Sequence, residues 1–207
     1  EIERFCAAGG GELDPDTVIS PGTLQAARRA AGSVVLAVDQ VMAGEIKNAF
    51  CCVRPPGHHA EHDRALGFCI YNNIAVGVKH ALEVHGLKKV AVVDFDVHQA
   101  NGTEDILIGD DRVLYCSTFQ HPFFPYTRLP ENSERVISVP LDASAKSAEF
   151  RAAVSDQWIP ALERFRPEMI FVSAMIAREI LSLSVPRGRA TATRRARHLP
   201  AASTGSG

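Results

Sequence analysis

The run Lys89-Val90-Ala91-Val92-Val93-Asp94-Phe95 sets the architecture that we expect for this chain. An uninterrupted valine-rich segment of this length is typical of a parallel strand that is buried on both faces. A helical pattern precedes it, beginning at a cap of Asn72 or Asn73 and reaching about His85, where Gly86 ends it. The run is therefore predicted to be a central strand of a sheet whose connections are helices.

The same alternation of helix and strand extends along the chain in both directions. Upstream, residues 20–23 open a helical pattern that continues to Ala43 and is closed by Gly44. Downstream, strands are predicted at residues 113–117, 136–139 and 168–174, with a helix at 147–164 that Pro160 is expected to kink. Such alternation favours an α/β fold with an open, mostly parallel sheet flanked by helices. In these sheets, ligands gather beyond the carboxyl ends of the strands.

The composition fits one soluble domain. The chain has 207 residues, of which 46% are hydrophobic, and it contains no apolar run long enough to span a bilayer and no signal-peptide pattern. Its five cysteines have no CxxC spacing, which indicates free thiols. We expect a cytoplasmic protein. Because the first residue is Glu1 and not Met, we also expect that an upstream part is missing.

Charge is distributed unevenly along the chain. Residues 1–174 hold 16 Lys and Arg against 23 Asp and Glu, whereas residues 175–207 hold 6 Arg against the single Glu179. A basic tail can bind nucleic acid, but this one lacks lysine and interleaved aromatic residues. Nucleic-acid binding is therefore not the predicted role. The sequence leaves the oligomeric state open.

Asp96 and His98 follow the valine-rich run two positions apart. If the strand geometry persists to its end, both side chains point to the same side. A carboxylate and an imidazole are ligands that zinc accepts, and a catalytic zinc needs three protein ligands and one open position. The pair thus predicts two of three zinc ligands. The alternative is that Asp-x-His merely ends a strand.

A second polar cluster, His58-His59, follows Pro55-Pro56-Gly57 in a predicted loop. Paired imidazoles suit general base and acid chemistry near neutral pH. Asp94 and Asn101 each offer a group that could fix the tautomer of one histidine. The alternative for the histidine pair is a solvated loop without a chemical role.

Taken together, these residues resemble the zinc-dependent histone deacetylases and their bacterial relatives, the acetylpolyamine amidohydrolases and acetoin-utilisation proteins. The resemblance runs from about residue 14 to residue 174. It is carried by ordered blocks, namely Asp16-Thr17, Ser20-Pro21-Gly22-Thr23, Arg54-Pro55-Pro56-Gly57-His58-His59-Ala60, Gly67-Phe68-Cys69-Ile70-Tyr71-Asn72-Asn73, Val93-Asp94-Phe95-Asp96-Val97-His98, Asn101-Gly102-Thr103 and Phe123-Phe124-Pro125.

The resemblance implies an arginase-like α/β fold and a zinc amidohydrolase that removes an acetyl group from lysine or a polyamine-like amine. It implies that Asp96 and His98 bind Zn²⁺ while His58 and His59 shuttle protons. Zinc would polarise the amide carbonyl and acidify its water, and acetate would leave the amine.

The resemblance assigns three further roles. Asp94 would orient a catalytic histidine and, with Ser117 and nearby carbonyls, would help to hold a structural monovalent cation, K⁺. Gly67, Phe68 and Phe124 would line a tunnel for a slender acylated amine, although aromatic residues in apolar runs more often belong to a core. The substrate could equally be an acetyl-lysine protein or an acetylpolyamine.

The chain departs from the family pattern after Ala174. Family members continue with Gly-Phe-Asp, whose Asp is the third zinc ligand, and later supply a catalytic Tyr; here Met175-Ile176-Ala177 follows, and no Tyr occurs after Tyr126. If common codons are assigned to residues 174–184 and this nucleotide sequence is translated in an adjacent reading frame, the product contains Asp-Pro-Leu-Ala. The family often has this segment near its metal-binding Asp. We therefore hypothesise a shifted reading frame.

We accordingly expect a partial deacetylase domain at residues 1–174, incomplete at its C-terminal side, and a non-matching, disordered basic tail at residues 175–207. Little activity is expected of this chain, because two zinc ligands hold and activate the ion less well than three. The alternative function is a non-catalytic remnant that binds a partner or an acyl ligand. A nucleotide-binding α/β protein is disfavoured, since no strand is followed by GxGxxG or a Walker-type loop.

Overall fold

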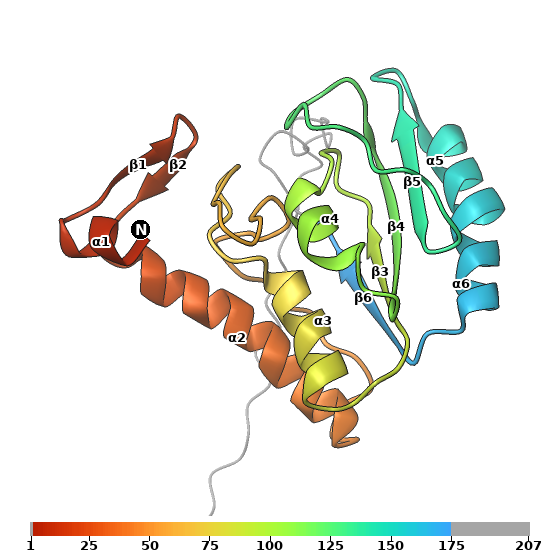
Figure 1. The fold of residues 1–207 in the computed structure, drawn as a ribbon, viewed down its shortest axis with the longest axis horizontal. Coiled ribbons are helices and arrows are strands. Elements are labelled where there is room, and N and C mark those ends of the chain that lie inside the picture. The colour runs from red at the N-terminus through yellow and green to blue at the C-terminus, as the bar shows by residue number, and fades with distance from the viewer. Residues whose placement is uncertain (1, 175–207) are drawn as a thin grey trace, which may run out of the picture. The chain divides into compact units, whose positions relative to one another are not determined.

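The computed structural model describes residues 2–174. Four parallel strands form its main sheet in the order β5-β4-β3-β6 (Figure 1). Their bounds are Val90–Asp94 for β3, Val113–Gln120 for β4, Val136–Leu141 for β5 and Met169–Ser173 for β6. The predicted parallel α/β sheet is thus confirmed. All four strands were predicted, and β4 and β5 extend a few residues beyond their predicted ends.

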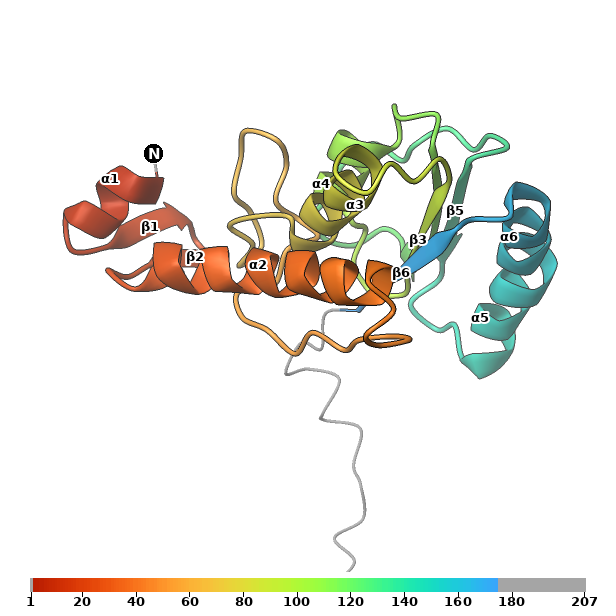
Figure 2. The ribbon, with the colours of Figure 1, turned by 90° about the horizontal axis from the view of Figure 1, so that it is seen from below.

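Helices cover both faces of this sheet. On one face lie α2 (Thr23–Met42), α3 (Asn73–Glu83) and α4 (Asn101–Leu107), and on the other α5 (Ser147–Ala153) and α6 (Ile159–Phe165) (Figures 1 and 2). Alternate residues of a strand point to opposite faces, so each strand contributes to two cores. None of the helices in residues 2–174 is both long and apolar enough to cross a membrane.

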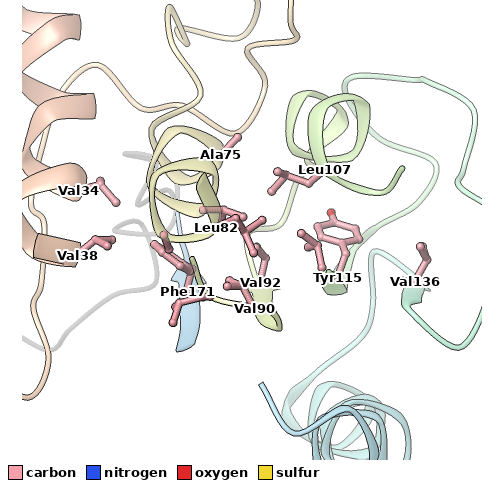
Figure 3. Close-up of a cluster of buried hydrophobic side chains, with 14 residues drawn as sticks. Val34, Val38, Ala75, Leu82, Val90, Val92, Leu107, Tyr115, Val136 and Phe171 are labelled. Carbon is pink, nitrogen blue, oxygen red and sulfur yellow. The ribbon is translucent and has the colours of Figure 1, made fainter. Parts of the chain in front are cut away.

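Strand β3 shows this division of the core most clearly. Val90 and Val92 pack with residues of α2, α3 and α4 in the larger cluster, where Tyr115 is also buried (Figure 3). The intervening Ala91 packs in a second cluster that contains Trp158. Burial on both faces is therefore the physical reason for the uninterrupted valine-rich run.

The helix ends follow the predicted signals. The Asn72 side chain accepts a hydrogen bond from the backbone N–H of Ala75 at 3.0 Å, which makes Asn72 the cap of α3. The helix ends at Glu83, two residues before the predicted end, and Gly86 adopts a positive φ of 71° in the turn that follows. Helix α2 ends at Met42, and Gly44, with a φ of 73°, follows its last cap residue, as predicted for the residue that closes the helix.

The helix predicted at residues 147–164 is observed as three consecutive helical segments that span residues 147–165. A π-helical turn, Val154–Trp158, separates α5 from α6. Pro160 lies in the first turn of α6, and a proline cannot donate the backbone hydrogen bond that would continue the preceding α-helix. The missing donor accounts for the wider π-helical turn immediately before Pro160, and the chain stays helical to Phe165.

Several elements were not predicted. Helix α1 (Ile2–Ala7) precedes an antiparallel hairpin of β1 (Gly11–Asp14) and β2 (Thr17–Ile19), and α4 begins shortly after the Asp96–His98 pair. The short apolar run at residues 49–53 carries no regular secondary structure. The disordered, non-matching tail expected at residues 175–207 lies outside the described residues.

Candidate active site

The carboxyl ends of three neighbouring strands converge where chemistry was predicted. Asp94, the last residue of β3, stands in register with Ser117 of β4 and Ser173 of β6. The loop before α3 brings His58 and His59 onto this edge, where they are only 4% and 1% exposed. The alternative of a solvated loop is therefore wrong for these two side chains.

His58 lies between a carboxylate and a second imidazole. Its Nδ1 is 3.1 Å from Oδ2 of Asp94, and its Nε2 is 3.1 Å from Nε2 of His59. Burial alone would lower the pKa of His58, but the charge and hydrogen bond of Asp94 outweigh it and raise that pKa above its ordinary value. His58 is thus suited to hold two protons, one donated to Asp94 and one to His59.

His59 has the opposite electrostatic character. Burial, and then the charge of His58, lower its pKa to about 3. Its Nδ1 is 2.8 Å from Oδ1 of Asn101, and the amide of Asn101 is oriented by donating to Oε1 of Glu61 at 2.7 Å. With the amide so oriented, Nδ1 of His59 must donate and its Nε2 is left as an acceptor. The pair therefore combines a charged and a neutral imidazole.

Asp96 and His98 are brought together by a turn and not by strand geometry. Strand β3 ends at Asp94, so the condition under which their alignment was predicted does not hold. Instead, Oδ1 of Asp96 accepts from the backbone N–H of His98 at 2.8 Å and lies 2.9 Å from its Nδ1. Such a turn is typical of an aspartate side chain that accepts from the backbone two residues on.

This donor pair fits a zinc ion in chemistry and spacing. Zinc–oxygen and zinc–nitrogen bonds of about 2 Å in tetrahedral geometry separate neighbouring ligand atoms by roughly 3.3 Å. The observed 2.9 Å between Oδ1 of Asp96 and Nδ1 of His98 requires only a small outward shift. Within residues 2–174, however, no third His, Cys, Asp or Glu converges on these two atoms.

Aromatic rings and one glycine enclose the imidazoles. Phe124 meets His59 edge-on at 5.0 Å between ring centroids, and Phe123 stacks on His98 at 5.0 Å with an interplanar angle of 12°. Gly67 has a φ of 54°, and a Cβ there would lie 2.6 Å from Cδ2 of His59. The next residue, Phe68, also has a positive φ and is 54% exposed. The three predicted tunnel residues are thus near one another, while the stacking of Phe123 was not foreseen.

A buried carboxyl below the histidines was also missed. Glu104 of α4 is 6% exposed, accepts from Nε2 of Gln99 at 2.8 Å and lies 3.3 Å from the hydroxyl of Tyr115. Burial raises its pKa to about 7. Glu104 lies three residues after Asn101, which places both side chains on the same face of a helix. This spacing was the only signal in the sequence that could have identified Glu104.

Two further aromatic residues differ in exposure: Phe119 is buried in β4, and Tyr126 is 76% exposed with a φ of 59°. The cysteines within the described residues are free, as predicted.

Comparison with known proteins gives a consistent result. The family model described as the histone deacetylase domain matches residues 2–175. A histone deacetylase-like amidohydrolase of Pseudomonas aeruginosa is 42% identical over 84% of this chain and 48% of its own length. A probable deacetylase of Archaeoglobus fulgidus is 36% identical over 80% of this chain and 47% of its own.

A solved structure agrees with these sequence matches. The crystal structure of the HDA15 HD domain superposes with a TM-score of 0.80 at 32% identity, covering 86% of this chain and 54% of that one. The chain thus spans about half the length of these proteins.

Proposed function

The chain belongs to the histone deacetylase family, and from that premise we propose that its site serves to hydrolyse the amide of an acetylated amine. The observation that carries the proposal is the continuous chain of contacts Asp94–His58–His59–Asn101. His58, inside this chain, also lies beside the Asp96–His98 pair, with its Nε2 3.9 Å from Oδ1 of Asp96.

In this proposal Asp96 and His98 are two ligands of a zinc ion. When bound, zinc would polarise the amide carbonyl and acidify a water molecule. The chemical fit of a carboxylate and an imidazole at adjacent ligand positions supports this assignment.

The protein's own groups move the proton. Asn101 fixes His59 as the Nδ1–H tautomer, so its Nε2 faces Nε2 of His58, and the two nitrogens share one proton over 3.1 Å while Asp94 compensates the charge. The pair can donate this proton to the departing amine, and a proton from the attacking water then replaces it between the two nitrogens. The rings of Phe123 and Phe124 keep water from the imidazoles, and with Gly67 and Phe68 they would form the wall of a channel for a slender acyl chain.

Two further assignments belong to the same proposal. Asp94 and Ser117, both 1% exposed and paired in register, would supply oxygen ligands to a structural K⁺. The acidic character of residues 1–174 would attract a cationic acetylated amine, whether on a protein lysine or on a polyamine.

We further propose that this chain turns over substrate poorly. The first 174 residues supply two zinc ligands, and the sequence Met175-Ile176-Ala177 stands where the family has Gly-Phe-Asp. A site with two protein ligands holds zinc weakly and acidifies water less. The same feature supports the alternative function, a remnant that binds an acyl ligand without hydrolysing it.

A turnover assay on the purified chain separates these outcomes. A fluorogenic acetyl-lysine peptide is incubated with and without added zinc, and wild type is compared with His98→Ala. No zinc-dependent turnover is expected. Zinc binding is compared in an Asp39→Asn background, because Asp39 belongs to a second group of possible metal ligands; in that background, weak zinc binding that His98→Ala abolishes is expected. Turnover that His98→Ala removes would overturn the proposed impairment and support the proposed activity. Zinc binding unaffected by His98→Ala, in a variant that also carries Asp39→Asn, would contradict the assignment of the ligands.

A further inference from the structure

A second cluster of metal-binding side chains lies away from the histidine pair, where α2 meets α3. Oδ1 of Asp39, on the last turn of α2, is 2.6 Å from Nε2 of His80 and 2.7 Å from Nε2 of His85. The three donor atoms lie within 4.8 Å of one another. Both imidazoles thus direct the same ring nitrogen at one point.

The position of the cluster in the fold separates it from the candidate active site. His85 precedes β3, whereas Asp96 follows it, so the two sites lie toward opposite ends of that strand. Five strand residues span roughly 16 Å, which excludes shared ligands between the two sites.

The surroundings favour a cation at this point. Asp39 and His80 lie near the C-terminal ends of α2 and α3, where the helix dipoles present their negative ends. The side chains of Asp39, His80 and His85 are 47%, 19% and 23% exposed, so an ion from solution can reach them.

The donor set matches a known preference of zinc. Two imidazole nitrogens and one carboxylate oxygen are a three-ligand set that leaves a fourth tetrahedral position for water. An ion between them would need the donor atoms to separate by several tenths of an ångström toward the roughly 3.3 Å of neighbouring tetrahedral ligands. Side chains at this level of exposure can make that movement without disturbing the core.

We propose that Asp39, His80 and His85 form a second zinc-binding site, which clamps the C-terminal turn of α3 to α2. Each ligand comes from a rigid element or its immediate end. The ion would replace the two hydrogen bonds that now converge on one carboxylate oxygen, and binding would therefore stabilise the contact between these helices.

The test uses the full chain carrying His98→Ala, which removes the other candidate zinc pair. Zinc binding is measured by equilibrium dialysis with elemental analysis, and the melting temperature is recorded with and without zinc. We expect one ion per chain and a higher melting temperature with zinc. Adding His85→Gln or Asp39→Asn is expected to weaken binding at least tenfold, since loss of even an outer-shell partner costs about 10- to 100-fold.

His62→Gln is the matched control in the same background. Nδ1 of His62 contacts Asp105 at 2.9 Å and its Nε2 lies 3.8 Å from Asp63, so its carboxylates lie on opposite sides of the ring and no second imidazole joins them within the described residues. This variant should bind zinc like its parent. Absence of bound zinc in the parent would overturn the proposal. So would zinc binding in the His85→Gln and Asp39→Asn variants that equals that of the parent. Melting temperatures measured without zinc show whether each variant is folded, and no readout depends on deacetylase turnover.

Discussion

Nε2 of His58 lies 3.1 Å from Nε2 of His59, although the two residues are adjacent in the chain. Two nitrogens this close can share one proton but cannot both carry one. Their outer nitrogens have different partners, a carboxylate at His58 and an amide at His59, and this difference decides which ring holds the charge. The environment thus separates two identical side chains into a cationic and a neutral member.

Replacing Asp94 by Asn should reverse the shift at His58. Burial is the largest influence on the pKa of this imidazole and lowers it, while the Asp94 carboxylate is the largest of the influences that raise it. In Asp94→Asn, the pKa of His58 should fall below the ordinary value of about 6.5. Titration of the imidazole resonances by NMR measures this, with Asp63→Asn as a control at an exposed carboxylate. An unchanged pKa of His58 would show that Asp94 is not the source of the shift.

Stability should fall as the pH is lowered from about 6.5 toward 4, because His59 must then be protonated on unfolding. Its pKa is about 3 in the folded protein, so the unfolded state binds more protons between these values and is favoured by acid. These roughly 2.5 pH units correspond to as much as about 3.4 kcal/mol. Urea unfolding with a chelator present measures the slope, which His59→Gln should reduce. An identical slope in the two proteins would contradict the low pKa of His59.

Glu104 should contribute with the opposite sign. Its pKa of about 7 in the folded protein lies above that of the unfolded chain, so its contribution to stability is present below about pH 4.5 and is lost as the pH rises through 7. Glu104→Gln removes this ionisation. As the pH rises from 5 to 8, the unfolding free energy of the wild type should therefore fall relative to that of Glu104→Gln by roughly 1–3 kcal/mol. A difference that does not change with pH would contradict the assignment.

Gly67→Ala should destabilise the protein by about 1–3 kcal/mol, since the position combines a left-handed backbone with a Cβ clash against His59. Gly32→Ala is the matched control. Gly32 is in the middle of α2, where an added Cβ would meet nothing within 4 Å, and alanine should stabilise that helix by about 0.5–1 kcal/mol. Thermal unfolding compares the two, and equal effects would refute the close packing at Gly67.

The strands, and the polar residues at their carboxyl ends, could be predicted from the sequence. Burial on both faces gives a strand such as β3 a continuous apolar run. Capping residues such as Asn72 and glycines such as Gly86 likewise act locally, so they are readable from single positions. The π-helical turn before Pro160 depends on how the chain accommodates one missing donor, which a periodic pattern does not encode.

The site divides in the same way. The two histidines and the Asp96–His98 pair were identified from motif spacing and resemblance, whereas the stacking of Phe123 and the burial of Glu104 depend on contacts between distant segments. The Asp39–His80–His85 cluster was not predicted for that reason, since forty-one residues separate its first two members. The side chains of Asp96 and His98 do lie close together, as predicted. The predicted reason was wrong, because a turn and not strand geometry brings them together.

Restoring the family sequence at the end of β6 should restore zinc binding. Replacing Met175→Gly, Ile176→Phe and Ala177→Asp together recreates the segment that carries the third ligand in the family. A third carboxylate adds charge and geometric constraint to the Asp96–His98 pair, so zinc affinity should rise by at least tenfold. Dialysis in an Asp39→Asn background measures the gain. The same triple replacement with Asn at position 177 is the control, because it keeps the shape and removes the charge. Equal zinc affinity in the Asp and Asn versions would show that position 177 does not reach the metal, and the shifted-frame explanation would then lose its physical basis.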